Sequence, residues 1–90
     1  MRKDLAENIA KIYKCLAESS DWLWIREIAR RTGLNHKTVS RLLDNYFSHF
    51  INERPMEQPF RVRLVKLKEN VTLENIMTLA AIKEKFKEIL

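Results

Sequence analysis

Residues 25–46 read IREIARRTGLNHKTVSRLLDNY, and this stretch decides the fold that the sequence predicts. Apolar residues recur at helical spacing, which predicts one helix from Arg26 to Arg31 and a second from Asn35 to Phe47. Gly33 is the only glycine of the chain, and it lies where a helix end needs a left-handed backbone that glycine adopts without steric penalty. Asn35 is a good N-cap for the second helix. The stretch therefore predicts two helices joined by a tight turn.

The core positions of this stretch each have a packing role. Ala29 is small, as is needed where two helices cross closely. The residues expected to form the small core between the helices are Ile28, Leu34, Val39 and Leu42. The string IAxxTGLxxxTVSRxL resembles the helix-turn-helix family, and is similar to that of many bacterial and archaeal transcription regulators. Trp24 departs from the family pattern, which often places a capping Ser or Thr just before the first helix.

A β-hairpin is predicted after the second helix. Phe50–Asn52 reads as a short strand, Glu53–Pro59 as a loop with both prolines, and Phe60–Leu67 as an alternating strand. That strand is expected to have an apolar side, with Phe60, Val62 and Leu64, and a water-facing side, with Arg61 and Arg63. A hairpin that follows the helix-turn-helix stretch extends the resemblance to the winged-helix subfamily.

The two ends of the chain are predicted to be amphipathic helices. The first helix runs from about Lys3 to Ser19, and the short β-prone run Trp22–Ile25 follows it. Thr72 can cap the last helix, which runs to about Leu90. The expected fold is mainly α with a small β-hairpin. We expect a winged helix-turn-helix domain at residues 1–70, and a C-terminal helix at 71–90 that packs on this domain and dimerises.

The positive charge of the chain is concentrated in its middle. The net charge is +5, and residues 26–68 hold ten Lys and Arg against four acidic residues, a net of +6. The rest of the chain has seven basic and eight acidic residues, a net of −1. A basic region suits an anionic partner such as nucleic acid, although a solvated surface also explains many basic small proteins.

The resemblance implies that the second helix enters the major groove of DNA and that the hairpin, or wing, touches the backbone or the minor groove. The candidate base-contacting residues at the front of this recognition helix are Asn35, His36, Lys37, Thr38, Ser40 and Arg41. Arg41 can grip a guanine by two hydrogen bonds, and Lys37 can reach a guanine or a phosphate. Asn35 suits capping better than base reading, and Thr38 suits packing or capping as well as DNA contact.

Six further arginines are candidates for contact with the DNA backbone. Those on the first helix of the motif are Arg26, Arg30 and Arg31, and those in the wing are Arg54, Arg61 and Arg63. The three arginines of the helix also fit a solvated helix face, so both interpretations stay open.

The sequence offers little to other classes of site. His36, His49 and Cys15 give no zinc-ligand spacing, and we find no catalytic set, cofactor motif or metal site. Cys15 is expected to be a buried thiol. Trp22 and Trp24 suit packing in the core or against the wing better than binding of a small ligand. No signal peptide or membrane span is visible, so the protein is expected to be cytoplasmic.

A homodimer is expected, because one recognition helix reads only a few base pairs. The residues of the last helix that alternate steps of three and four, as a helix–helix seam requires, are Leu79, Ile82, Phe86 and Ile89. The expected function is sequence-specific binding of double-stranded DNA, as a transcription regulator. The alternatives are a winged-helix module that binds proteins, RNA binding, and a last helix that only folds back on its own domain.

Overall fold

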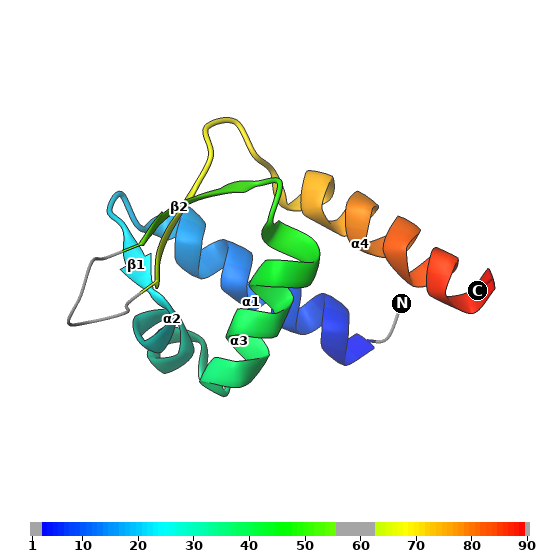
Figure 1. Cartoon of the computed structure of the whole chain (residues 1–90), viewed down its shortest axis with the longest axis horizontal. Coiled ribbons are helices and arrows are strands. Elements are labelled where there is room, and N and C mark those ends of the chain that lie inside the picture. Colours follow the sequence, from blue (N-terminus) through cyan, green and yellow to red (C-terminus); the bar gives the residue numbers. More distant parts are fainter. Residues whose placement is uncertain (1–2, 56–62, 90) are drawn as a thin grey trace.

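The computed structural model describes residues 3–55 and 63–89, and it is mainly helical with a small three-stranded antiparallel sheet (Figure 1). This confirms the expected balance of helix and hairpin. The elements in chain order are α1 (Lys3–Glu18), β1 (Leu23–Trp24), α2 (Ile25–Thr32), α3 (His36–Leu42), the π-helical turn η1 (Leu43–Phe47), β2 (Ile51–Pro55), β3 (Arg63–Leu67) and α4 (Leu73–Ile89).

The turn between α2 and α3 has the predicted chemistry. Gly33 has a φ of 75°, in the left-handed region, and its N–H donates to the carbonyl of Ala29 at 2.9 Å. The side chain of Asn35 accepts a hydrogen bond from the N–H of Lys37 at 2.8 Å, so Asn35 is the N-cap of α3. Both predictions are confirmed. Trp24 precedes α2 and makes no side-chain cap hydrogen bond.

The predicted helix from Asn35 to Phe47 is divided into two parts. The α-helical part ends at Leu42, and the chain continues as one π-helical turn, in which hydrogen bonds span five residues instead of four. The apolar residues on the inner face of this segment are all buried, namely Val39, Leu42, Leu43, Tyr46 and Phe47. The burial of Val39 and Leu42 confirms the predicted core positions, while the wider turn was not predicted.

The sheet has the strand order β1-β3-β2, so β3 is central and pairs on both sides. The pairing of β2 with β3 confirms the predicted hairpin. The prediction of a loop from residue 53 onward was wrong at its start, because Glu53, Arg54 and Pro55 pair with β3. Pro55 is tolerated there because β2 is an edge strand, whose outer N–H groups need no partner. Residues 56–59 lie outside the described part.

The predicted water-facing side of β3 was also wrong. Phe60, Arg61 and Val62 lie outside the described residues, but Val65 is fully buried. Because side chains alternate along a strand, Arg63 shares the core side with Val65, and Leu64 lies on the opposite side. The buried row that joins Leu23 of β1 to Val65 therefore fixes which side of the sheet faces the helices.

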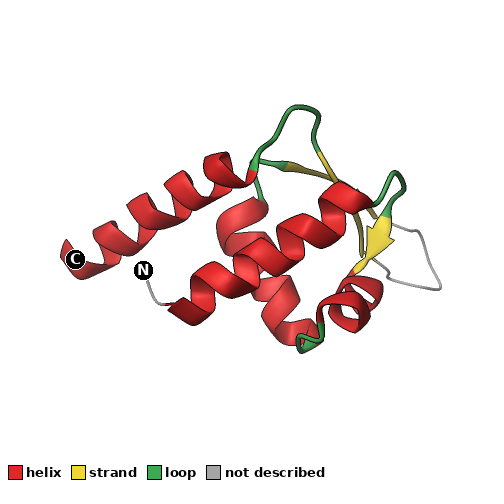
Figure 2. Ribbon diagram, turned by 180° about the vertical axis from the view of Figure 1, so that it is seen from behind, coloured by secondary structure: helices red, strands yellow, loops and turns green. Residues whose placement is uncertain are grey.

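One hydrophobic core joins all the helices to the sheet. It contains Ile9 and Ile12 of α1, Val65 of β3, and Ile76 and Ala80 of α4. The thiol of Cys15 is buried as predicted, and this burial raises its pKa. Figure 2 shows α4 running past the core, with its C-terminal end beside the start of α1.

The start of α4 is capped as predicted. Thr72 Oγ1 accepts from the N–H of Asn75 at 3.2 Å, and Asn75 Oδ1 accepts from the N–H of Thr72 at 3.0 Å. The Tyr13 hydroxyl donates to the carbonyl of Val71 at 3.3 Å, which ties the segment before α4 to α1.

Candidate nucleic-acid interface

The outward side of α3 presents a polar and basic surface. His36, Lys37 and Arg41 are exposed, whereas Thr38 and Ser40 are half-buried. A shallow depression on this side is lined by His36, Lys37, Ser40, Arg41, Asp44 and Asn45. The structure thus brings together most of the predicted base-contacting residues, while the side chain of Asn35 is engaged as the cap.

Arg63 decides the charge of this surface. Its Nε donates to Glu53 Oε1 at 3.1 Å, its Nη2 lies 2.7 Å from Asp44 Oδ1, and its Nη1 lies 3.5 Å from Ser40 Oγ. These contacts raise the pKa of Arg63, chiefly through the hydrogen bond to Glu53. Arg63 therefore pairs with two acidic residues that border α3. Within residues 3–55 and 63–89, Lys37 and Arg41 form no ion pair.

The position of Arg63 differs from that of a solvent-facing phosphate contact. Its side chain is only 26% exposed, and it joins β3 to β2 and to the α3–η1 segment. The alternation of the hairpin alone placed this residue on the wrong side. In the sequence, only the acidic residues Asp44 and Glu53, which precede Arg63, indicate that it could form ion pairs. Whether they reach Arg63 depends on the register of the hairpin.

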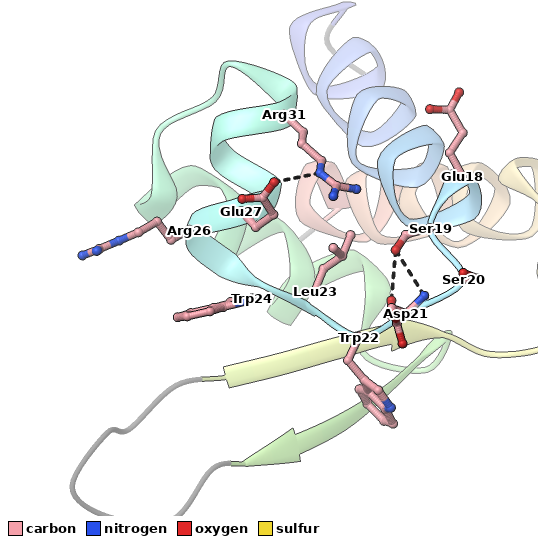
Figure 3. Close-up of a pocket in the computed structure, with 10 residues that line it drawn as sticks. All are labelled: Glu18, Ser19, Ser20, Asp21, Trp22, Leu23, Trp24, Arg26, Glu27 and Arg31. Atoms are coloured by element: carbon pink, nitrogen blue, oxygen red, sulfur yellow. Dashed lines mark hydrogen bonds and ion pairs between the residues drawn. The ribbon is translucent and has the colours of Figure 1, made fainter.

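On α2, one acidic residue holds two of the three predicted arginines. Glu27 Oε2 accepts from Arg30 Nε at 3.1 Å, and Glu27 Oε1 accepts from Arg31 Nε at 2.9 Å. The hydrogen bond from Arg30, followed by that from Arg31, lowers the pKa of Glu27 to about 2. Arg26 points away from Glu27 in Figure 3, and it has no acidic partner in the described part of the chain.

The start of α2 borders an open depression of about 680 Å³ around β1 (Figure 3). Both tryptophans line it, together with Glu18, Asp21 and Glu27. Trp24 is 51% exposed and pairs with Leu64 of the hairpin, so of the two predicted positions, in the core or against the wing, the core is excluded. The reason is the register of β1, in which Leu23 takes the buried position opposite Val65 and Trp24 takes the outer one. Among the described residues, no His, Cys, Asp and Glu cluster could hold a metal ion.

The remaining predicted residues lie on the hairpin and on α4. Arg54 is exposed on β2, and Arg61 lies outside the described residues. On α4, Leu79 is half-buried, while Ile82 is 48% and Phe86 is 59% exposed. Ile89 ends the helix, and its side chain lies outside the described part.

Two contacts that the sequence did not predict join α4 to η1. The Tyr46 hydroxyl donates to Glu84 Oε1 at 2.6 Å, and the Lys83 ammonium donates to the carbonyl of Asn45. Burial, followed by the hydrogen bond to Glu84, raises the pKa of Tyr46 to about 12. The last turn of the segment that carries the candidate DNA contacts is therefore attached to α4.

Comparison with known proteins leaves the family of the chain open. No protein-family model matches it, and no curated protein matches it either. In the described part, no helix has the length and apolar character that crossing a bilayer requires.

Proposed function

We propose that this chain is a winged-helix protein that binds double-stranded DNA and regulates transcription. In this proposal α2 and α3 form the helix-turn-helix, and β2 and β3 form the wing. The observation that carries it is the exposed side of α3, where Lys37 and Arg41 have no acidic partner in the described part because Arg63 pairs with Asp44 and Glu53. A helix with such a side fits the major groove.

The roles of the residues follow from their positions. Arg41 is the candidate for a bidentate contact to guanine, and Lys37 for contact to a base or a phosphate. His36, Thr38 and Ser40 supply further hydrogen-bonding groups along the same side. Arg26 of α2 and the wing residues Arg54 and Arg61 are the candidates for backbone contact. Arg63 supports the site by pairing with acidic residues instead of with phosphate.

The first experiment measures binding of fluorescently labelled duplex DNA by anisotropy at a series of salt concentrations. We expect log affinity to fall against log salt with a slope of about −0.9 for each phosphate neutralised. Unlabelled duplex RNA as a competitor separates DNA binding from the RNA alternative. Absence of binding to both selected and random duplexes at about 50 mM salt would refute the proposal.

The second experiment tests the base-reading role of Arg41. After selection of a preferred site from random duplexes, Arg41→Ala should lose roughly 1–3 kcal/mol of discrimination at one base pair. Lys11→Ala is the matched control, because it removes the same charge from an exposed position on α1. An equal loss of affinity for every sequence would make Arg41 a phosphate contact.

We further propose that two chains associate through α4. The supporting observation is the exposed apolar strip formed by Ile82 and Phe86, on a different side of the helix from the buried Ile76 and Ala80. Two recognition helices would then read half-sites one helical turn apart, about 34 Å, on a palindromic duplex.

A further inference from the structure

The three-stranded sheet has an outer face, turned away from the helices. Leu23 and Val65 are buried on the inner face, and Glu53 in the same row bonds to Arg63. Because side chains alternate along a strand, the intervening residues point to the other side. The described strand residues of this outer face are Trp24, Asn52, Arg54, Leu64 and Lys66.

Three of these residues form one row across the sheet. Trp24 pairs with Leu64, and Leu64 pairs with Arg54, so the indole and the guanidinium flank one leucine on the same face. Two strand spacings separate the Cα atoms of Trp24 and Arg54 by about 10 Å. Trp24 is 51% exposed, and Arg54 is exposed. An accessible aromatic ring thus lies within reach of an accessible cation.

The charge of the outer face is positive. Arg54 and Lys66 form no ion pair with any described residue, and no described strand residue on this face is acidic. Arg26 extends from the start of α2 to the same side as Trp24 (Figure 3). Glu53, the acidic residue of β2, lies on the inner face with Arg63.

We propose that this outer face binds a single-stranded segment of nucleic acid, with an unpaired base stacked on Trp24 and its neighbouring phosphates on Arg54 and Lys66. An exposed aromatic ring beside cations is the chemistry that binds single strands without sequence preference, because every base has a face that can stack. This second site shares Arg54 with the wing contacts proposed above, but its stacking residue Trp24 lies on the side of the sheet opposite to Arg63 and α3.

The arrangement favours a single strand over the two other occupants. In a duplex the bases stack on one another, so their faces are not free to stack on an indole. A protein partner needs a larger apolar area than Trp24, the half-buried Trp22 before it and the half-buried Leu64 provide. The cations add the charge complementarity that a phosphate backbone requires.

The test compares single-stranded and duplex ligands on three variants of the full chain. The probes are labelled oligo(dT), oligo(rU) and a random duplex, measured by anisotropy at low salt. Trp24→Leu keeps an apolar side chain without an aromatic ring, Trp24→Phe keeps a ring, and Arg41→Ala changes only the proposed duplex site. Trp24 makes no cap hydrogen bond, so neither substitution removes one from α2.

We expect Trp24→Leu to weaken oligo(dT) binding about fivefold or more, Trp24→Phe to retain most of it, and both to leave duplex binding unchanged. Arg41→Ala should do the reverse. Equal binding of oligo(dT) and oligo(rU) assigns the site to any single strand, and a preference assigns it to one of the two. Unchanged oligonucleotide binding in Trp24→Leu, or equal losses on single strand and duplex, overturns the proposal.

A fluorescence titration provides a readout that needs no disruptive variant. Trp22→Phe leaves Trp24 as the only indole of the chain. We expect added oligo(dT) to quench this indole and protect it from iodide, while added duplex does neither. An unchanged spectrum with bound oligo(dT) would overturn the site. Loss of duplex binding alone would refute the α3 proposal and leave this one standing.

Discussion

A single carboxylate, that of Glu27, holds two of the three arginines of α2. Replacing it by an amide, Glu27→Gln, should release Arg30 and Arg31 for contact with phosphate. We expect several-fold tighter binding of duplex DNA at low salt, with a salt slope steeper by up to about 1.8 for two added phosphates. Glu7→Gln is the matched control, because it makes the same charge change at an exposed position of α1. Equal effects of the two variants would contradict this prediction.

The same carboxylate predicts a pH dependence of stability. The two arginines lower the pKa of Glu27 from 4.5 to about 2, so the folded chain favours the charged form. The stability that these pairs contribute is therefore present above about pH 4.5 and is lost as the pH falls toward 2. Thermal unfolding should show a larger loss of Tm between these pH values for the wild type than for Glu27→Gln.

Gly33 carries the third prediction at this scale. Its φ of 75° disfavours residues with a side chain, although a Cβ there would meet no atom within 4 Å. Gly33→Ala should therefore lower the free energy of unfolding by about 1 kcal/mol, from backbone conformation alone. Gly33→Asn should cost less, because asparagine tolerates the left-handed region. Urea unfolding measures both, and a stability of Gly33→Ala equal to that of the wild type would refute the argument.

The residues that the sequence predicted best are those whose role is local. Gly33, Asn35 and Thr72 act within a few residues of their own position, so the neighbouring letters indicate what each does. Glu27 was not predicted as a partner, although Arg30 and Arg31 lie three and four positions later. That spacing fits both a paired and a freely solvated arginine, and only the side-chain conformation decides between them.

At the scale of elements, Arg63 connects the hairpin to the α3–η1 segment. Arg63→Gln should leave Asp44 and Glu53 without their partner beside α3, and so weaken duplex binding several-fold at low salt. The free energy of unfolding should fall by roughly 1 kcal/mol, because the pairs are partly exposed. Anisotropy and urea unfolding measure the two effects.

Two further variants separate the bridging role of Arg63 from its charge. Lys68→Gln removes one positive charge from an exposed position that has no ion pair in the described part, and it should have the smaller effect. Adding Glu53→Gln to Arg63→Gln should restore part of the duplex affinity. No rescue, together with equal losses in Lys68→Gln, would mean that Arg63 contributes only its charge.

The sequence predicted which elements exist better than how they end. Apolar residues at 39, 42, 43, 46 and 47 fit an α-helix and a helix with one wide turn equally well. The spacing of apolar residues therefore could not predict η1. Pro55 suggested a loop, but proline is compatible with an edge strand. The sequence of one strand does not indicate whether that strand lies at the edge of the sheet. The core side of β3 depended on β1, a two-residue partner 40 positions earlier.

At the scale of the whole molecule, the exposed strip on α4 predicts the oligomeric state. Phe86 is 59% exposed, and Phe86→Glu should convert a dimer to a monomer by placing a charge in the seam. Sedimentation of the wild type at tens of micromolar should give a dimer. Phe86→Leu is the control, because it keeps an apolar side chain and should remain dimeric. A monomeric wild type would remove this prediction and leave duplex binding intact.

It was predictable that α4 has both buried and exposed apolar residues, because it has more apolar residues than one core can cover. Ile76 and Ala80 are buried on one side of the helix, while Ile82 and Phe86 lie exposed on another, as the helical period requires. The contacts that join α4 to η1, from Tyr46 to Glu84 and from Lys83 to the carbonyl of Asn45, were not predictable, since each joins residues 38 positions apart. Such pairs depend on the crossing of two helices and not on either sequence alone.

The attachment of α4 to η1 has a mechanical consequence. Tyr46 bonds to Glu84, and Lys83 bonds to the carbonyl of Asn45. These contacts attach α4 at two adjacent points to the end of the segment that carries Arg41. We expect a partner bound at Phe86, which is exposed close to these two contacts, to move the segment together with α4. Such a partner would thereby change the orientation in which Arg41 is presented.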